Sequence, residues 1–220
     1  MCGAVPSTCP TGSQTLGAAI SPSGGFTGGG LFYPTGIAID TTSGVAWVSN
    51  TGTGGVSRID SSGQVTGPYS GGGQENQQGI AVDPFGNVWV ANDDSVTELN
   101  SAGVLLAGPI TGGGIGPTSG PYGLAIDGAG NVWVNNYNGN SITELAPDGT
   151  VLCPSGGFTA GGVVSLPQNA IRVDASGNVW AVIRFESQWK WAVVQFIGAA
   201  TPVQTPLLGR PVTPTKRRRR

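Results

Sequence analysis

The 220-residue sequence contains no histidine, and only 10% of its residues are charged. The absence of histidine removes the most frequent general base and metal ligand, and it excludes a Ser-His-Asp triad. No apolar run reaches the roughly 18 residues that a membrane-spanning helix needs. The first residues also lack the basic start and apolar stretch of a secretory signal. We therefore expect no membrane span and no histidine-based catalysis.

Cysteine is also scarce, with three residues in the chain. No two of the cysteines are spaced as C-x-x-C, so the usual spacing of a zinc site is absent. The three residues are Cys2, Cys9 and Cys153. A Cys2–Cys9 disulfide stays open as an interpretation. Cys153 lies in a strand pattern and is expected to be a small buried residue.

The formal net charge of −2 hides an uneven distribution. Five of the ten basic residues form the stretch 216–220, which leaves five basic residues against 12 acidic ones in the rest of the chain. An acidic body disfavours nucleic acid as a partner. The basic tail at 209–220 has two open interpretations, a solvated end or a non-specific contact with an anionic surface.

Glycine, in contrast, is abundant, with 39 residues. Glycine is costly in helices, and these glycines follow no strict period of three, so neither a helix bundle nor collagen is expected. Many short strands joined by glycine-rich turns suit this composition.

A short motif occurs four times at intervals of about 43 to 47 residues, and a tryptophan follows each copy by six or seven residues. The copies are PTGIAID at 34–40, QQGIAVD at 77–83, PYGLAID at 121–127 and QNAIRVD at 168–174, and the tryptophans are Trp47, Trp89, Trp133 and Trp180. Each unit holds four short apolar stretches with a period of two, rich in β-branched and aromatic residues. Four strands in 40–50 residues is the size of one propeller blade.

The predicted fold class is therefore all-β, a β-propeller of about four four-stranded blades. The expected blades span 34–76, 77–120, 121–166 and 167–208, between an N-terminal segment at 1–15 and the tail at 209–220. The sequence PSGGFT occurs at both 22–27 and 154–159, so a partial strand at 16–21 would be the last strand of a preceding blade. Either this strand or the stretch 202–206 would complete the last blade. A closed four-bladed ring and a part of a larger ring both stay open.

The repeated motif P-x-G-[IL]-A-[IV]-D-x-x-G-N-[VI]-W-V-x-N resembles NHL repeats, and especially those of the virginiamycin B lyase (streptogramin lyase) family. The resemblance covers about residues 16–208 and implies a bacterial propeller protein. In that family one histidine is the general base and a second helps to organise a Mg²⁺ site. Neither role can be carried over to this chain, which has no histidine.

Residues present in every repeat are expected to be structural. The aspartates should accept backbone N–H groups in the turn after each first strand, and the tryptophans should pack between blades. The aspartates are Asp40, Asp83, Asp127 and Asp174. A ring of calcium ligands is the alternative for these aspartates, although no D-x-[DN]-x-[DN]-G loop occurs.

Functional residues should lie where the repeats differ, on loops that share one face of the ring. Asp93 and Asp94 with Glu75 or Glu186 would offer oxygen ligands to Mg²⁺ or Ca²⁺. The other candidates for ligand binding replace small residues or stand in loops without a counterpart. They are Tyr137, Trp189 and Arg172. Arg172 replaces an alanine of the first strand, and two interpretations stay open: it faces the channel and binds an anion, or it pairs with an acidic residue in a degraded terminal blade.

These observations predict a non-catalytic propeller module for binding or scaffolding. Its partner would be a protein, a peptide or a glycan, and no cofactor is expected. The alternative is a metal-dependent enzyme of the lyase or lactonase type, which the absence of histidine disfavours. The surface, rich in glycine, serine, threonine and asparagine, suggests an extracellular or periplasmic location.

Overall fold

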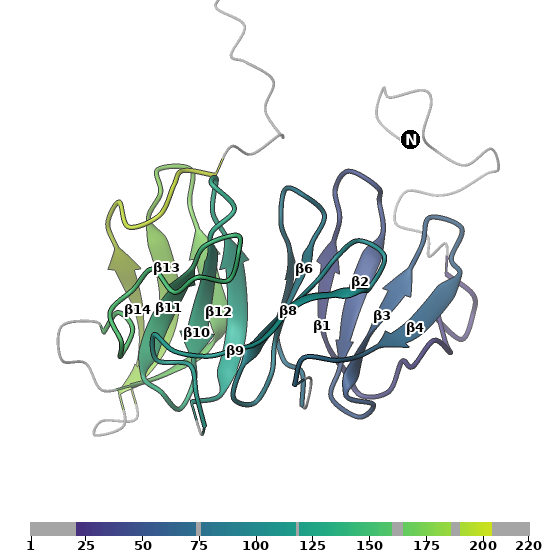
Figure 1. Ribbon diagram of the computed structural model, residues 1–220, viewed down its shortest axis with the longest axis horizontal. Coiled ribbons are helices and arrows are strands. Elements are labelled where there is room, and N and C mark those ends of the chain that lie inside the picture. Colours follow the sequence, from purple (N-terminus) through teal and green to yellow (C-terminus); the bar gives the residue numbers. More distant parts are fainter. Residues whose placement is uncertain (1–20, 74–75, 118, 160–164, 186–189, 204–220) are drawn as a thin grey trace, which may run out of the picture.

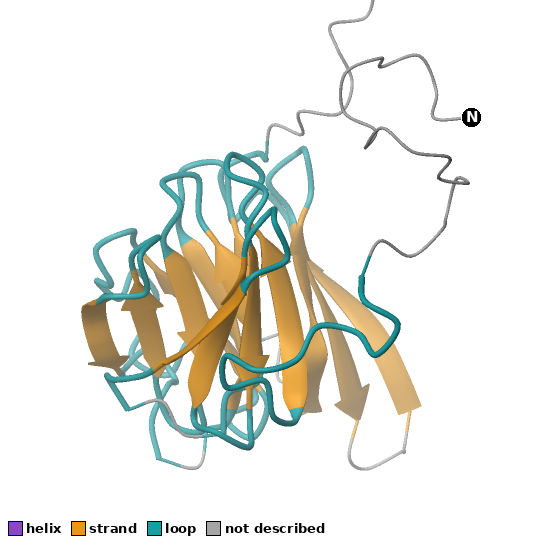
Figure 2. Cartoon of the chain, turned by 90° about the vertical axis from the view of Figure 1, so that its right-hand side faces the viewer, coloured by secondary structure: helices purple, strands orange, loops and turns teal. Residues whose placement is uncertain are grey.

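The computed structural model describes residues 21–73, 76–117, 119–159, 165–185 and 190–203. All 14 elements in this part of the chain are β-strands, and turns or loops connect them (Figure 2). Across the described ranges there is no helix long and apolar enough to cross a membrane. The expected all-β class is confirmed.

The first eight strands form two four-stranded antiparallel sheets with the same order. Sheet 1 contains β1 (Pro34–Ile39), β2 (Ala46–Asn50), β3 (Gly55–Ile59) and β4 (Val65–Tyr69). Sheet 2 contains β5 (Ile80–Val82), β6 (Val88–Ala91), β7 (Val96–Leu99) and β8 (Leu105–Ile110). In each sheet the strands pair in chain order, as expected for propeller blades.

The remaining six strands form two sheets of three strands each. Sheet 3 contains β9 (Pro121–Ile126), β10 (Val132–Asn136) and β11 (Ser141–Leu145), and sheet 4 contains β12 (Ser165–Val173), β13 (Val179–Phe185) and β14 (Lys190–Phe196).

Four strands were expected in sheet 3, but only two isolated bridges follow β11. Val151 pairs with Leu145, and Phe158 pairs with Ile142. The turn at 154–157 separates the two bridges, because it begins with a proline and contains a glycine at φ 77°.

The four sheets stand side by side in chain order, from β4 at one side to β14 at the other (Figure 1). Their first strands are neighbours: β1 contacts β5, β5 contacts β9, and β9 contacts β12. Among the described residues, β1 and β12 form no comparable contact. The four blades therefore form an arc with an outer face at each end.

The hydrophobic core lies between consecutive sheets, in three separate clusters. In each cluster the tryptophan of one sheet packs against aliphatic side chains of the next. Trp47, Trp89 and Trp133 are almost completely buried, which confirms the expected packing between blades. Trp180 differs: it is 38% exposed, because no further described sheet covers it.

The repeated aspartates close the turn after each first strand, as predicted. In three copies Oδ1 accepts two backbone N–H groups, for example from Phe85 and Asn87 at Asp83 and from Ala129 and Asn131 at Asp127, all at 2.9 Å. The carboxylate thus replaces solvent for donors that the turn leaves unpaired.

Several predictions concern the ends of the chain. Of the partial strand at 16–21 only Ser21 is described, and it lies in a bend instead of a strand. Residues 201–203 also form no strand. The segments 1–15 and 209–220, with Cys2 and Cys9, lie outside the described residues.

Cys153 was predicted to be a buried residue in a strand, and this prediction is wrong. The residue lies in a bend, is only partly buried, and is a free thiol with Sγ 3.6 Å from the carbonyl oxygen of Gly113. The adjacent Pro154 accounts for the end of the strand pattern, since proline cannot donate to a ladder.

Candidate ligand-binding face

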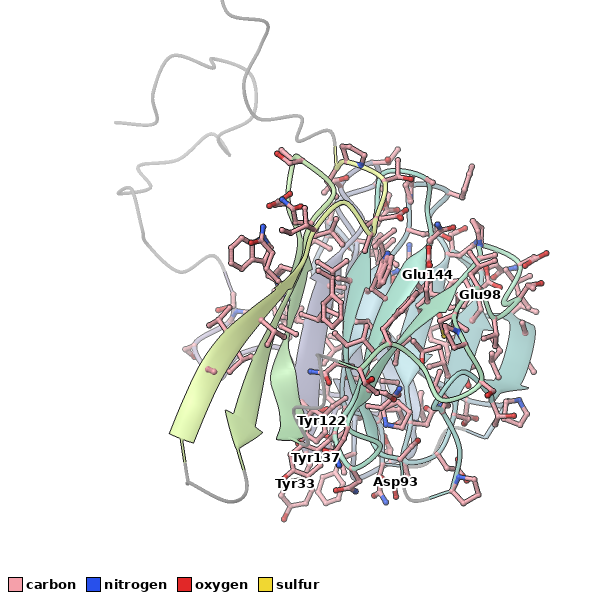
Figure 3. All side chains as sticks on the ribbon, turned by 90° about the vertical axis from the view of Figure 1, so that its left-hand side faces the viewer. Tyr33, Asp93, Glu98, Tyr122, Tyr137 and Glu144 are labelled. Atoms are coloured by element: carbon pink, nitrogen blue, oxygen red, sulfur yellow. The ribbon has the colours of Figure 1, made fainter. Side chains whose placement is uncertain are left out.

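One end of the sheets gathers the loops between second and third strands and the connections into first strands. Figure 3 shows Tyr33, Asp93, Tyr122 and Tyr137 at this end, opposite Glu98 and Glu144. We call this surface the tyrosine end and define it by Tyr33, Asn76, Asp93, Tyr122, Tyr137 and Asn138. The sequence predicted that these loops share a face.

A repeated hydrogen-bond relay fixes the loops at this end. In sheet 3, Asn136 Nδ2 donates to Thr143 Oγ1 at 2.8 Å, and Thr143 Oγ1 donates to the carbonyl oxygen of Gly113. Sheets 1 and 2 repeat it through Asn50, Ser57 and Gly29 and through Asn92, Thr97 and Gly72. Each relay joins the second strand and the third strand of a blade to the glycine-rich connection that leads into that same blade.

In each glycine-rich connection, the residue whose carbonyl oxygen accepts the last hydrogen bond of the relay is a glycine. Gly29, Gly72 and Gly113 have φ angles of 54°, 61° and 59°, in the left-handed region. A Cβ on Gly113 would lie 2.7 Å from both Cys153 Sγ and Val151 Cγ1. The runs of three glycines at 28–30, 71–73 and 112–114 therefore allow the chain to pass close over each sheet.

Further hydrogen bonds join the loops of sheets 2 and 3. Gly120 donates its N–H to the carbonyl oxygen of Asp93 at 3.1 Å, and Tyr137 donates its N–H to the carbonyl oxygen of Gly120 at 2.8 Å. Asn76 Nδ2 donates to Asp93 Oδ2 at 2.6 Å. The exposed carboxylate is thus oriented within a connected set of loops.

Two aromatic pairs lie at the tyrosine end. The rings of Tyr122 and Tyr137 are tilted to each other with centroids 5.7 Å apart. Phe32 and Tyr33 form an edge-to-face pair at 4.6 Å, and Tyr33 is 70% exposed. Aromatic rings held in loops by their neighbours offer a large contact area at a low cost in side-chain entropy.

Backbone strain is concentrated in the same loops. The described non-glycine residues with positive φ are Tyr33 (50°), Asn76 (46°) and Asn140 (53°), and all three belong to these loops. Asparagine tolerates this conformation, but a bulky tyrosine does so rarely, at a cost of order 1 kcal/mol or more. Such strain persists only where surrounding contacts impose it, and it is frequent at binding sites.

A cavity of about 300 Å³ lies between the first strands of the four sheets. Tyr122 lines it, together with Thr35, Gln78 and Arg172. Arg172 donates from Nη1 to the carbonyl oxygen of Ile171 at 2.7 Å, and the described lining residues include no carboxylate. The arginine that replaces an alanine of the motif thus brings a positive charge to the cavity beside the tyrosine end.

The comparisons with known proteins concern the fold. No model of a known protein family matches the chain, and no curated protein matches it. Among solved structures, the hydrazine synthase of Kuenenia stuttgartiensis matches with a TM-score of 0.61 at 17% identity, over 84% of this chain and 49% of the other. A catalytically inactive virginiamycin B lyase from Staphylococcus aureus, solved with quinupristin, matches with a TM-score of 0.56 at 19% identity, over 79% and 56%.

The chain folds as a β-propeller similar to virginiamycin B lyase. A nidogen/laminin complex matches as well, with a TM-score of 0.53 at 18% identity, over 79% of this chain and 68% of the other. The chain spans about half the length of the virginiamycin B lyase and hydrazine synthase chains that it matches. At such identities the likeness shows the fold alone.

The structure places some of the predicted site residues together and leaves others undescribed. Asp93 and Tyr137 lie at the tyrosine end, Asp94 is exposed next to Asp93, and Arg172 lines the neighbouring cavity. Glu75, Glu186 and Trp189 lie outside the described residues.

The four acidic residues expected to form a cation site are therefore not found together among the described residues. In the described ranges no group of three or more acidic or cysteine side chains is arranged to hold a metal ion. The Asp93 carboxylate instead accepts a hydrogen bond from Asn76.

The opposite end of the sheets contains two acidic residues that the sequence analysis missed. Glu98 is buried, and this desolvation, with the nearby charges of Asp83 and Asp148, raises its pKa to about 7. Burial likewise raises the pKa of Glu144, and the charge of Asp127 adds to the shift. The repeated TEL at 97–99 and 143–145 was the available signal, since each glutamate pairs in register with a repeated tryptophan.

Proposed function

We propose that the chain is a non-catalytic propeller module that binds a neutral oligosaccharide across the tyrosine end. The observation that carries the proposal is the Tyr122–Tyr137 pair, held beside Asn138 and Asp93 by the backbone bonds through Gly120. Sugar rings present C–H faces that pack on aromatic rings, and their hydroxyl groups pair with amides and carboxylates.

The relay and the glycine-rich connections support this proposal, because they attach the loops to rigid strands before a ligand arrives. A site of this kind loses little conformational entropy on binding. Tyr122 and Arg172 both line the cavity between the first strands, so a ligand at the tyrosine end would approach one positive charge. Propeller neighbours include a lyase and a protein complex, which shows that the fold does not decide the chemistry.

The chemistry of the chain favours binding over turnover. It has no histidine to act as a base at neutral pH. Nothing in the described part of the chain specifically favours the lyase or lactonase alternative. An extracellular or periplasmic location, which would expose the module to glycans, stays a prediction from composition.

The test is a glycan array, followed by titration calorimetry with the neutral oligosaccharide that binds best. We expect Tyr137→Ala to weaken binding at least tenfold, since aromatic anchors contribute about 2 kcal/mol or more to binding. Phe85→Ala is the matched control, because Phe85 is an exposed aromatic in the turn between β5 and β6 at the other end. Equal loss in both variants, binding of peptides instead of glycans, or chemical conversion of the bound sugar would contradict the proposal.

A further inference from the structure

Each internal contact between blades has the same two halves. One sheet contributes its tryptophan, and the next contributes aliphatic side chains from its first and second strands. Between sheets 1 and 2, Trp47 packs in one cluster with Ile80 and Val88. Between sheets 3 and 4, Trp133 packs with Ile171 and Val179. We call the two halves the tryptophan face and the aliphatic face.

Sheet 1 has an aliphatic face that no described sheet covers. Ile37 and Ile39 of β1 occupy the positions of Ile80 and Val82 in β5. Ile80 is buried in the cluster with Trp47, whereas Ile37 is 66% exposed and Ile39 is 51% exposed. Ile37 and Ile39 stand two residues apart on one strand, so their side chains lie on the same face of the sheet and expose apolar surface together.

Sheet 4 has the complementary half, a tryptophan face that no sheet in the described part of the chain covers. Trp180 occupies the position of Trp133, and Val193 occupies the position of Ile142. Trp133 and Ile142 are 1% and 4% exposed, whereas Trp180 and Val193 are 38% and 62% exposed. The two outer faces of the arc are thus the two halves of the contact that the chain already makes three times.

Sheet 4 also lacks a fourth strand in the described residues, and the chain contains a matching segment elsewhere. In sheet 3 this outer position is held by PSGGFT at 154–159, where Phe158 bridges to Ile142 and stacks on Trp133 with ring centroids 5.7 Å apart. The same six residues at 22–27 precede sheet 1, and Phe26 lines one cavity together with Ala46 and Ile59 of that sheet.

Residues 201–203 do not fill this position. Thr201 exchanges hydrogen bonds with the turn at Asp127 and Gly128, and Val203 donates to the carbonyl oxygen of Asp174. The outer edge of β14 therefore has no described strand beside it, and such an edge is a template for pairing with another chain.

We propose that two copies of this chain associate through these faces. The tryptophan face of sheet 4 in one copy packs on the aliphatic face of sheet 1 in the other, and the segment 22–27 of the second copy pairs along β14 of the first. A two-fold axis makes both contacts equivalent and closes the two arcs into one ring of eight blades.

A second copy is the occupant because its faces match in detail. In the described residues of one chain nothing covers either face at the two ends of the arc, and β1 and β12 share no hydrophobic cluster. The second copy supplies an aliphatic face for the tryptophan, a Phe26 for the position of Phe158, and a strand for the open edge. The proposal is independent of what the tyrosine end binds.

The first test is light scattering of the full 220-residue chain after size-exclusion chromatography, across a concentration series. We expect twice the chain mass of 22.1 kDa. A monomer at every concentration would overturn the proposal, and so would a mass that keeps growing with concentration, because it indicates open-ended association instead of closure.

Substitutions distinguish this specific contact from non-specific association. Trp180→Glu and Ile37→Lys should each raise the dissociation constant at least a hundredfold, while Phe85→Glu, at an exposed residue outside both faces, should leave it within twofold. Ile80 and Trp47 share a cluster inside the chain, so Ile37 and Trp180 should meet between the copies. The double variant Ile37→Lys, Trp180→Glu should therefore regain dimer relative to either single variant. Dimers that survive both single variants, with unchanged circular dichroism, would overturn the proposal.

Discussion

The indole Nε1 of Trp89 donates a hydrogen bond to Oδ2 of Asp83 across 3.2 Å, in the buried space beside sheet 2. The other carboxylate oxygen of Asp83 accepts two backbone N–H groups of the turn. The pairs Asp127–Trp133 and Asp174–Trp180 repeat the arrangement. One carboxylate in each of these blades thus joins the turn to the repeated tryptophan, and in sheets 2 and 3 this tryptophan packs against the next blade.

Asp83→Ala is expected to lower the free energy of unfolding by about 2–3 kcal/mol, because it leaves buried donors without their charged acceptor. The measurement is urea unfolding followed by tryptophan fluorescence. Asp94→Ala is the matched control, since that aspartate is exposed in a loop and its loss should change stability by less than about 0.5 kcal/mol. Equal effects of the two substitutions would show that the buried carboxylate is not structural.

Glu98 should make the protein less stable as the pH rises. Its pKa is about 7 in the folded chain and near 4.5 in the unfolded chain, so the folded state binds more protons between these values. The free energy of unfolding should therefore fall from pH 4.5 to 7.5, by an amount of order 3 kcal/mol or less.

The measurement is urea unfolding at several pH values in that window. Glu98→Gln should flatten the profile and make the protein more stable than the parent at pH 7.5. Below pH 4 the trend should reverse, because hydrogen bonds from Ser43 and the Thr42 N–H lower the pKa of Asp40 and its contribution is lost on protonation. A parent profile that rises from pH 4.5 to 7.5 would contradict the assignment to Glu98.

The sequence predicted the features that repeat and missed those that depend on which sheet faces which. The spacing of Asp83 and Trp89 was enough to expect a turn carboxylate and a packing indole, because both roles follow from local patterns. The hydrogen bond between them was not expected, since it depends on the side chain crossing from the turn to the next strand. The exposure of Trp180 was not predicted either, because a motif does not show whether another blade follows.

The candidate site divides in the same way. The loop placement of Asp93 and Tyr137 followed from the order of strands in a blade. The partner of Tyr137 did not, because Tyr122 stands inside a repeat and looked like a motif residue. The sequence showed Asn136 only as the last residue of the repeated motif, although its amide connects two strands to Gly113 through Thr143.

Thr143→Val tests that relay with little change in side-chain volume. The substitution leaves the Asn136 amide and the Gly113 carbonyl without this hydroxyl, so we expect unfolding to become easier by about 1–3 kcal/mol. Sheet 4 supplies the comparison, because Val194 already occupies the equivalent position and no threonine is present there. Val194→Thr should bring no gain in stability. If Thr143→Val were neutral, the relay would not hold the connection in place.

Gly113→Ala should disturb both stability and the tyrosine end. The residue has φ 59°, and an added Cβ would lie 2.7 Å from Val151 Cγ1, so the substitution introduces backbone strain and a steric clash together. We expect a loss of about 1–3 kcal/mol in the free energy of unfolding.

Gly156→Ala is the matched control for Gly113→Ala, because Gly156 has no atom within 4 Å of its added Cβ and no positive φ. That substitution should be neutral or slightly stabilising, since alanine reduces the entropy of the unfolded chain. Hydrogen exchange gives the second measurement: Gly113→Ala should speed exchange at the amides of Gly120 and Tyr137, which follow the altered connection, more than at β6. If exchange rose equally in β6 of sheet 2 and at these loop amides, the glycine would support the propeller as a whole and not specifically the loops of the tyrosine end.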